Sequence, residues 1–358
     1  MVNLQRIKMK KTKNKQNPVH QHYVPVFILK NFAKRSGRFL VYDVASKKFF
    51  PQPAKKAYAE NDFYTIKTND EDDYEIEKNL SKFESEITPI FRKIVTTDQI
   101  ELKRSELETL RIFLSLLAFR SKFRKEQYQN QNFDVETKLT LNTLANNQDY
   151  VSLWKNEIKA LSTFRKYKQI EESVEIDCAI KQEFVDDYKN YYMTIIKLYG
   201  QSFILSDVFP TLECLNASNG EQIVLHMIYP LSPTVAIVLN LATFKKEYME
   251  SLSPLQHKLV SLSRVSGNVV IEPKRKYKYS PLFQNDEDIF IYDTKKVYPR
   301  DAIYINCLIL NEVRNNFIFN NKEKLLDVIQ RYKNEDGLKQ NYDNLELALE
   351  KALERSTK

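Results

Sequence analysis

The sequence predicts an α+β fold, mostly helical, with a small N-terminal β unit and a second short sheet around residues 201–272. Runs of aromatic and β-branched residues occupy the chain before residue 68 and between 201 and 272. Apolar residues instead recur every three or four positions between 72 and 200 and again after 300. Strands and helices are therefore segregated along the chain, whereas a doubly wound sheet would alternate them.

The N-terminal β unit is predicted from the stretch GRFLVYDVASKKFF, Gly37 to Phe50, in which two aromatic-rich runs flank a polar turn. This pattern is typical of a β-hairpin. The nearby stretch ENDFYTI can supply another short strand.

The first long helix is predicted between Ile76 and Ile94, where apolar residues are spaced by four and three positions. Pro89 is expected to kink it. Ser105 and Glu108 have the spacing of a capping box at the start of the next helix. That helix is apolar on most of its circumference, so we expect it at the centre of the core.

The remaining elements follow from changes of pattern. We expect further helices between residues 134 and 165 and from Lys181 to Tyr199, where Gly200 is a natural C-cap. The runs QSFILSDVFP, EQIVLHMIYPLSP and TVAIVLN then predict at least three strands. From Asp301 to Asn320 the pattern is helical again.

The domain organisation is expected to be simple, because 358 residues with 42% hydrophobic content can bury a substantial core. Residues 1–18 are predicted to be a disordered basic leader. Residues 19–358 are predicted to form a single α+β domain that comprises a β-rich opening unit (19–68), a helical region (72–200), a sheet (201–295) and a helical tail (300–358).

The formal charge of +8 is concentrated in that leader. The first nineteen positions contain six basic residues and no acidic ones, which leaves 49 basic against 47 acidic residues in the rest of the chain. The leader is either a solvated tail or a contact for phosphates or a membrane surface. The nearly neutral body does not indicate a nucleic-acid-binding protein by itself.

Composition also excludes several classes. The five glycines are isolated, so a P-loop, a dinucleotide fingerprint and a GxSxG elbow are not expected in their usual forms. The three cysteines are far apart and form no CxxC pair, which disfavours a disulfide framework and a cysteine zinc site. No apolar run reaches the length of a membrane span, so we expect a cytoplasmic protein without a membrane partner.

His20 and His22 are the first candidate site residues. On an extended segment, residues two positions apart point the same way, so both imidazoles could bind one metal ion. The alternative is that one histidine packs or caps a turn while the other is solvated. A divalent metal is the only cofactor that the sequence suggests, and its identity is not determined.

A second candidate lies in VVIEPKRKYKY, Val269 to Tyr279. Glu272 and Lys274 form an E-x-K pattern after a strand, as in nucleases where carboxylates bind a divalent metal and lysine steadies the attacking water. Asp207, at the end of another predicted strand, is the expected second carboxylate. The same stretch interleaves Lys276 and other basic residues with tyrosines, so residues 274–279 are either a nucleic-acid contact or a solvated loop.

The chain also resembles a bacterial family, the domain-of-unknown-function family 4238. The resemblance begins with QHYVPVFILKNFA, FLVYDVASKKFF and AENDFYTI. It continues in LLAFRSKFR, in FILSDVFP with YPLSPTVAIVL, and in INCLILNEVRNNFIF, up to about Asn320. It implies one domain that spans most of the chain and no settled activity.

The resemblance also selects polar positions for testing. It points to His22, Asn31, Asp207, Asn306 and Arg314. The internal helix motif adds two arginines as candidate substrate-binding residues, Arg120 and Arg124.

Two functional hypotheses follow. The first is a metal-assisted hydrolase that acts on nucleic acid in an antiviral or toxin-like system, with His22, Asp207, Glu272 and Lys274 as catalytic residues. The alternative is a non-catalytic module that binds or senses nucleic acid or protein. Clustering of His22, Asp207 and Glu272 would favour the hydrolase, and their scattering would favour the binding module. The oligomeric state is not predicted.

Overall fold

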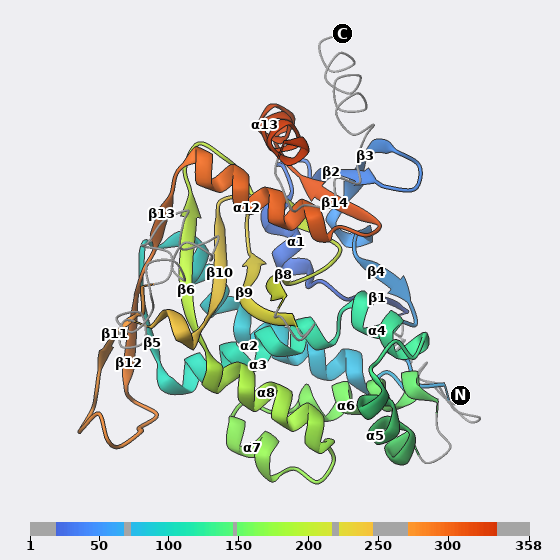
Figure 1. Cartoon of the computed structure of the whole chain (residues 1–358), viewed down its shortest axis with the longest axis vertical. Helices are drawn as coiled ribbons and strands as arrows, with labels where there is room; N and C mark the ends of the chain where they lie inside the picture. Colours follow the sequence, from blue (N-terminus) through green and yellow to red (C-terminus); the bar gives the residue numbers. More distant parts are fainter. Residues whose placement is uncertain (1–18, 68–72, 146–148, 217–221, 246–270, 335–358) are drawn as a thin grey trace, which may run out of the picture.

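The computed structural model describes residues 19–67, 73–145, 149–216, 222–245 and 271–334, and Figure 1 shows their arrangement. The predicted basic leader and the end of the predicted helical tail lie outside these residues. Within them the protein is a mixture of helices and strands, as predicted. The prediction of a mostly helical chain is not supported, because the strands form four separate sheets in the described residues.

The N-terminal unit contains the predicted hairpin, which pairs β2 with β3. A second antiparallel pair joins β1 to β4, so the histidine segment is itself a strand. The elements of this unit are β1 (His20–His22), α1 (Val26–Phe32), β2 (Arg38–Asp43), β3 (Lys48–Pro53), η1 (Ala54–Lys56) and β4 (Ala59–Asn61).

The helical layer contains both predicted long helices. Pro89 lies inside α2, and the predicted central helix is α3, in which every residue from Leu110 to Leu117 is buried. The helices of this layer are α2 (Glu75–Thr96), α3 (Arg104–Phe119), α4 (Lys122–Gln129), α5 (Val135–Ala145), α6 (Tyr150–Leu161), α7 (Tyr167–Glu172) and α8 (Cys178–Asn190).

Two local predictions in this layer were wrong. The capping carboxylate of α3 is Glu106, which accepts the backbone N–H of Lys103 at 2.8 Å, and not Glu108. The predicted helix from Lys181 to Tyr199 ends at Asn190. The residues that follow, YYMTIIKL, are aromatic and β-branched and form strand β6.

The largest sheet has the strand order β13-β6-β10-β9-β8. All its pairs are antiparallel except that of β13 with β6. Its strands are β6 (Tyr191–Leu198), β8 (Thr211–Asn216), β9 (Gln222–Pro230), β10 (Val235–Leu241) and β13 (Lys295–Val297), and η2 (Ala242–Phe244) follows β10. A three-stranded sheet lies beside it, formed by β5 (Gln99–Lys103), β11 (Lys274–Lys276) and β12 (Ile289–Asp293).

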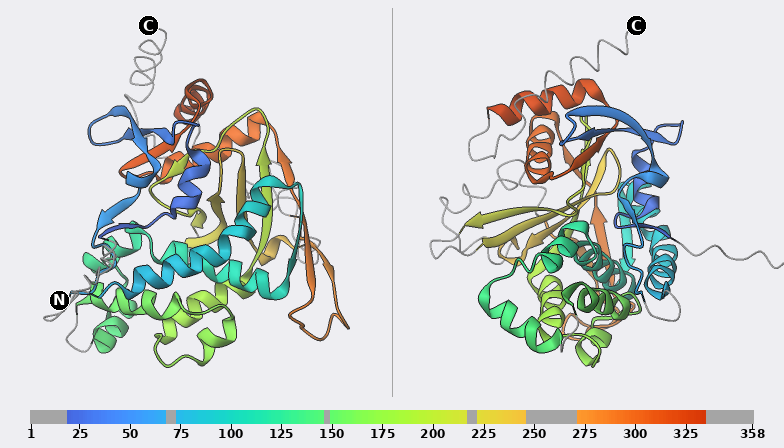
Figure 2. Two further views of the ribbon diagram at one scale, coloured as in Figure 1. Left: turned by 180° about the vertical axis from the view of Figure 1, so that it is seen from behind. Right: turned by 90° about the vertical axis from the view of Figure 1, so that its right-hand side faces the viewer.

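The C-terminal part returns to the N-terminal unit. The predicted helix from Asp301 to Asn320 is only half correct, because α12 (Pro299–Glu312) ends before a turn and β14 (Asn316–Phe319). Strand β14 pairs with β2 on one side and with β7 (Leu205–Ser206) on the other. Helix α13 (Lys322–Lys333) then packs on α12 (Figure 2).

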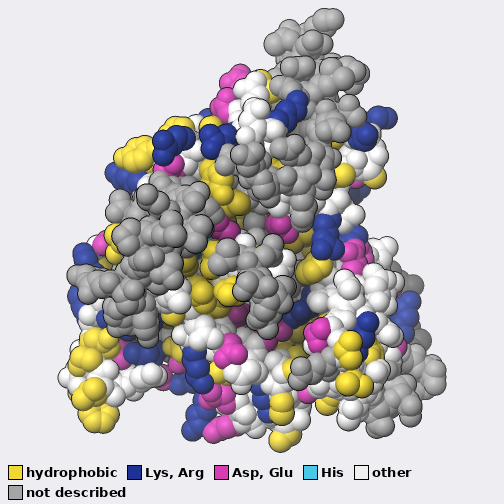
Figure 3. Space-filling view, viewed as in Figure 1, with side chains coloured by type: hydrophobic (Ala, Val, Ile, Leu, Met, Phe, Trp, Pro, Cys, Tyr) yellow, Lys and Arg dark blue, Asp and Glu magenta, His cyan; other side chains and the backbone are white. Residues whose placement is uncertain are grey.

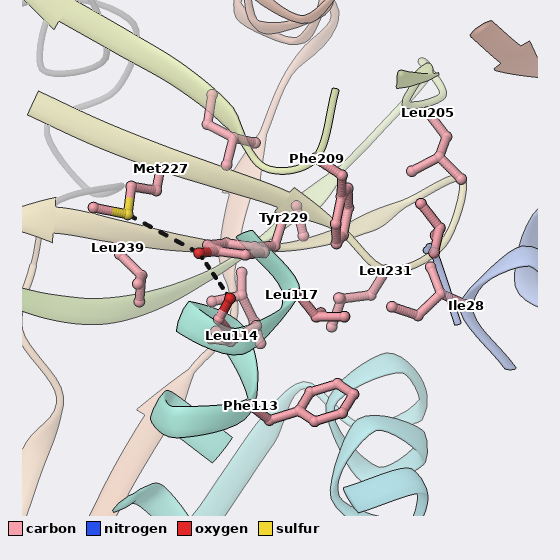
Figure 4. Close-up of a cluster of buried hydrophobic side chains, with 14 of the residues drawn as sticks. Ile28, Phe113, Leu114, Leu117, Leu205, Phe209, Met227, Tyr229, Leu231 and Leu239 are labelled. Atoms are coloured by element: carbon pink, nitrogen blue, oxygen red, sulfur yellow. Dashed lines mark hydrogen bonds between the residues drawn. The ribbon is translucent and has the colours of Figure 1, made fainter. Parts of the chain in front are cut away.

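The core lies between the five-stranded sheet and α3. The Tyr229 hydroxyl on β9 donates a hydrogen bond to the Leu114 carbonyl oxygen on α3 at 3.3 Å, and apolar side chains surround it (Figure 4). Sheet and helix therefore bury one another's apolar faces. Among the described helices, none combines the length and apolar character that crossing a membrane requires.

Candidate functional site

The segment that contains His20 and His22 forms strand β1, which pairs with β4 in a two-stranded antiparallel sheet. The Nε2 atom of His22 lies 3.2 Å from the carbonyl oxygen of Lys55. Since a carbonyl only accepts, this contact places a proton on Nε2. The pKa of His22 is lowered from 6.5 to about 4, chiefly by burial and secondly by the charge of the neighbouring His20. His22 is therefore a neutral imidazole near pH 7.

The two histidines do lie side by side, with ring centroids 5.4 Å apart. Nδ1 of His20, however, contacts the side-chain oxygen of Asn61 at 3.2 Å, and Nε2 of His22 is used by Lys55. No group of three or more His, Cys, Asp or Glu side chains in the described part of the chain is placed to hold a metal ion.

Asp207 is buried at the end of β7, where its carboxylate binds the turn between α12 and β14. Oδ1 accepts the backbone N–H of Arg314 at 3.0 Å. Oδ2 accepts the backbone N–H and the side-chain amide of Asn315, both at 2.8 Å. These three hydrogen bonds offset the cost of burying the charge, and they fix the position of the turn.

That turn presents Arg314 to α4. The Arg314 guanidinium carbon lies 4.1 Å from the centroid of the Phe123 ring. Together they border a surface pocket of about 260 Å³ whose other walls are side chains of α4 and the loop after it: Glu126, Gln127, Asn130 and Asn132. The predicted residue Arg314 thus lies in a pocket that also contains an aromatic ring, amides and a carboxylate.

Glu272, Lys274 and Lys276 lie elsewhere. They belong to the start of the β11–β12 pair, and Figures 1 and 2 place β11 and β1 on opposite sides of the molecule. Glu272 forms an ion pair with Arg275 at 3.0 Å, and Lys276 forms one with Glu101 at 3.4 Å. The structure therefore does not bring Glu272 together with His22 or Asp207.

Lys274 forms an ion pair with Asp293 at 3.3 Å. Asp293, Glu272 and Lys274 line one small pocket of about 80 Å³ beside β6. Asp293 therefore shares a pocket with the E-x-K pattern, whereas the sequence predicted Asp207 as its second carboxylate.

The two predicted asparagines connect backbone segments. Asn306 on α12 is fully buried, accepts the N–H of Ile204 at 2.9 Å and donates to the carbonyl of Ser202 at 2.8 Å. Asn31 on α1 donates to the carbonyl of Leu231 at 2.9 Å. Both side-chain amides are thereby used within the fold.

The two predicted arginines are also engaged. Arg120 is buried and pairs with Glu84 at 2.7 Å, although its Nε has no hydrogen-bond partner in the part of the chain that the structure describes. Arg124 pairs with Glu183 and donates to the Gln127 side chain at 3.0 Å. Neither guanidinium lines the pocket beside Arg314.

Sequence reasoning missed a buried polar row across the large sheet. His226 on β9 contacts the Asn240 side chain on β10 at 2.9 Å, and Asn240 donates to Thr194 on β6 at 3.0 Å. Glu213 on β8 lies opposite His226 in the register. Among the described residues, Nε2 of His226 and Oε2 of Glu213 are buried and have no hydrogen-bond partner.

The residues that complete the Arg314 pocket were also missed. Phe123 lies within the LLAFRSKFR motif but has no chemical group that marks a site. Asn130 and Asn132 lie in a loop whose position the sequence does not define. An aromatic residue beside an arginine is recognisable only when the turn at residue 314 is known to meet α4.

The fold and the site define an α+β protein with a polar surface pocket between α4 and the α12–β14 turn. The chain belongs to the family described as "Protein of unknown function (DUF4238)", whose model matches residues 20–324. This match confirms the resemblance inferred from the opening motif. The comparisons with curated proteins and with solved structures found no match.

The buried carboxyl of Glu213 generates a prediction about pH. Burial alone raises its pKa from 4.5 to about 7, so over this range the folded state binds a proton that the unfolded state has released. Stability contributed by the neutral carboxyl is therefore lost as the pH rises from 4.5 to about 7. A Glu213→Gln variant stays neutral and avoids this loss.

We expect the free energy of unfolding of Glu213→Gln, relative to that of the wild type, to be higher at about pH 8 than at about pH 5. Urea unfolding at the two pH values measures this difference. The exposed Glu172→Gln variant is the control. A stability difference for Glu213→Gln that is the same at both pH values would contradict the assignment.

Proposed function

We propose that the protein is a binding module for single-stranded nucleic acid and that the Arg314 pocket takes one nucleotide. The observation that carries this proposal is the guanidinium of Arg314 over the Phe123 ring at the mouth of the pocket. A guanidinium plane and an aromatic ring both provide surfaces on which an unpaired base can stack.

The charge of Arg314 supports this proposal. Within the described part of the chain, no carboxylate forms an ion pair with its guanidinium, and the side chain is exposed. Its backbone, in contrast, is fixed by Asp207. An arginine on a fixed backbone whose guanidinium forms no ion pair with the described residues can bind a phosphate through two parallel hydrogen bonds.

The amides supply the hydrogen-bonding groups that base recognition needs. The side chains of Asn130 and Asn132 make no hydrogen bond to the rest of the described structure. Asparagine both donates and accepts, as does the edge of a nucleobase. Glu126 adds an acceptor for an exocyclic amino group.

The binding module is favoured over the hydrolase by the distribution of the predicted catalytic residues. His22 contacts the backbone of the N-terminal unit, Asp207 holds the α12–β14 turn, and Glu272 lies at the other side of the molecule. General acid-base catalysis needs its groups within reach of one reacting centre.

The binding proposal predicts that Arg314→Ala weakens the binding of labelled single-stranded RNA and DNA of about 12 nucleotides by about tenfold or more. The reason is the loss of one stacking surface and one phosphate contact. Fluorescence anisotropy on the full chain measures the affinity, so the basic leader is present in every variant.

The matched control is Arg300→Ala, which removes an exposed arginine near the start of α12, the helix that precedes the Arg314 turn. An unchanged affinity in Arg314→Ala would show that the oligonucleotide does not bind in this pocket. An equal loss of affinity in Arg300→Ala would show that the oligonucleotide is held by charge alone.

The metal-assisted hydrolase is the second candidate, because Glu272, Asp293 and Lys274 line one pocket. Two carboxylates could hold a divalent cation there, and the lysine could orient a water. Binding a cation would first require Glu272 and Asp293 to exchange their present ion pairs with Arg275 and Lys274 for the metal.

This second proposal predicts cleavage of labelled oligonucleotides that depends on Mg²⁺ or Mn²⁺ and is lost in Glu272→Gln and in Lys274→Ala. The control is Lys168→Ala, another exposed lysine in a single ion pair. Cleavage that persists in both pocket variants, or no cleavage with either metal, would eliminate the hydrolase.

A further inference from the structure

The loop between β11 and β12 exposes three large apolar side chains close together in the sequence. Tyr279, Leu282 and Phe283 have exposed fractions of 75%, 87% and 69%. Large apolar side chains are rarely left in water together unless they contact something else. None of them contributes to the pocket of Arg314.

The loop also projects from the body of the protein. Figure 1 and the rear view in Figure 2 both show the connection between β11 and β12 extending beyond the helices next to it. In the space-filling view, hydrophobic side chains gather on the same lower-left edge (Figure 3). The apolar group, Tyr279, Leu282 and Phe283, therefore forms a convex apolar tip.

The acidic residues at the base of this tip are neutralised inside the chain. Three consecutive carboxylates each form an ion pair of 2.6 to 2.9 Å with a basic residue at the end of β5 or at the start of α3 or α7: Glu287 with Lys103, Asp288 with Arg104 and Asp286 with Lys166. Lys278, on the other side of the tip, forms no ion pair with the described residues. The loop thus presents no unpaired carboxylate to an anionic surface.

The dimensions of the tip disfavour a stable protein partner. Three side chains of this kind expose about 400–500 Å², well below the about 800 Å² that each partner buries in a stable interface. A lipid surface requires neither that area nor a complementary shape. Aromatic side chains beside a lysine prefer the boundary between the head groups and the acyl chains of a bilayer.

We propose that Tyr279, Leu282 and Phe283 insert into the head-group region of a lipid bilayer and hold the protein at its surface. This contact is peripheral and involves no membrane-spanning helix. It does not depend on the proposed nucleic-acid pocket, which lies on α4 and the α12–β14 turn.

Cosedimentation of the full chain with vesicles tests the proposal. The vesicles are phosphatidylcholine alone or phosphatidylcholine with phosphatidylglycerol, in about 0.5 M salt to screen the basic leader. We expect binding to both, and about a tenfold or greater loss of affinity in the Leu282→Ser/Phe283→Ser double variant. Val174→Ser is the matched control, since Val174 is 97% exposed and lies elsewhere.

Equal thermal unfolding of the variants and the wild type establishes that the fold is intact, as expected for exposed positions. Failure of the wild type to bind vesicles in high salt, or binding that the double variant retains, would overturn the proposal. So would light scattering that shows a dimer of the wild type and a monomer of the double variant, because the tip would then be a self-association contact.

Discussion

The arrangement of the site depends on the hydrogen bonds between the Asp207 carboxylate and the turn that follows α12. The carboxylate accepts three hydrogen bonds from Arg314 and Asn315. The backbone N–H of Asp207 also donates to the carbonyl oxygen of Asn316 at 3.2 Å. This contact joins β7 to the turn that begins β14. The turn leads into β14, an inner strand of the four-stranded sheet, and directs Arg314 towards Phe123.

Two tyrosines of the N-terminal unit, Tyr23 and Tyr58, also lie near Asp207. Burial raises the pKa of Tyr23 and Tyr58, and the charge of Asp207 is the next cause in both cases. The Tyr58 hydroxyl also donates to the Leu205 carbonyl at 2.8 Å. Tyr23 of the opening segment therefore lies within the electrostatic influence of Asp207, whereas the two histidines of that segment are used within the N-terminal unit.

The sequence predicted the elements with strong local patterns better than their contacts. The α2 periodicity and the aromatic runs of the β2–β3 hairpin specify one structure each, and both formed as predicted. The stretch from Tyr191 to Leu198 follows a helical pattern without a break, but its aromatic and β-branched residues form β6 and not the predicted helix. Likewise β14 follows α12 closely, and its pairing with β2 is not visible in the local sequence.

The site was less predictable than the fold, since its parts come from distant segments. The family resemblance pointed to Asp207 and Arg314. The sequence did not show that the Asp207 carboxylate fixes the turn that contains Arg314. The same resemblance pointed to Asn31 and Asn306, whose side chains hydrogen-bond to the backbone of other segments. A polar residue in an otherwise apolar segment thus indicates a required hydrogen bond, and only the structure shows whether the partner is the protein or a ligand.

The most direct test of this account is a double-mutant cycle between Asp207→Asn and Arg314→Ala, with the affinity for single-stranded oligonucleotide as the measurement. If Asp207 acts by positioning Arg314, Asp207→Asn weakens binding in the wild-type background and has no further effect when Arg314 is already alanine. Equal losses in both backgrounds, with the fold intact by urea unfolding, would contradict the claim that the Asp207 contact directs the arginine.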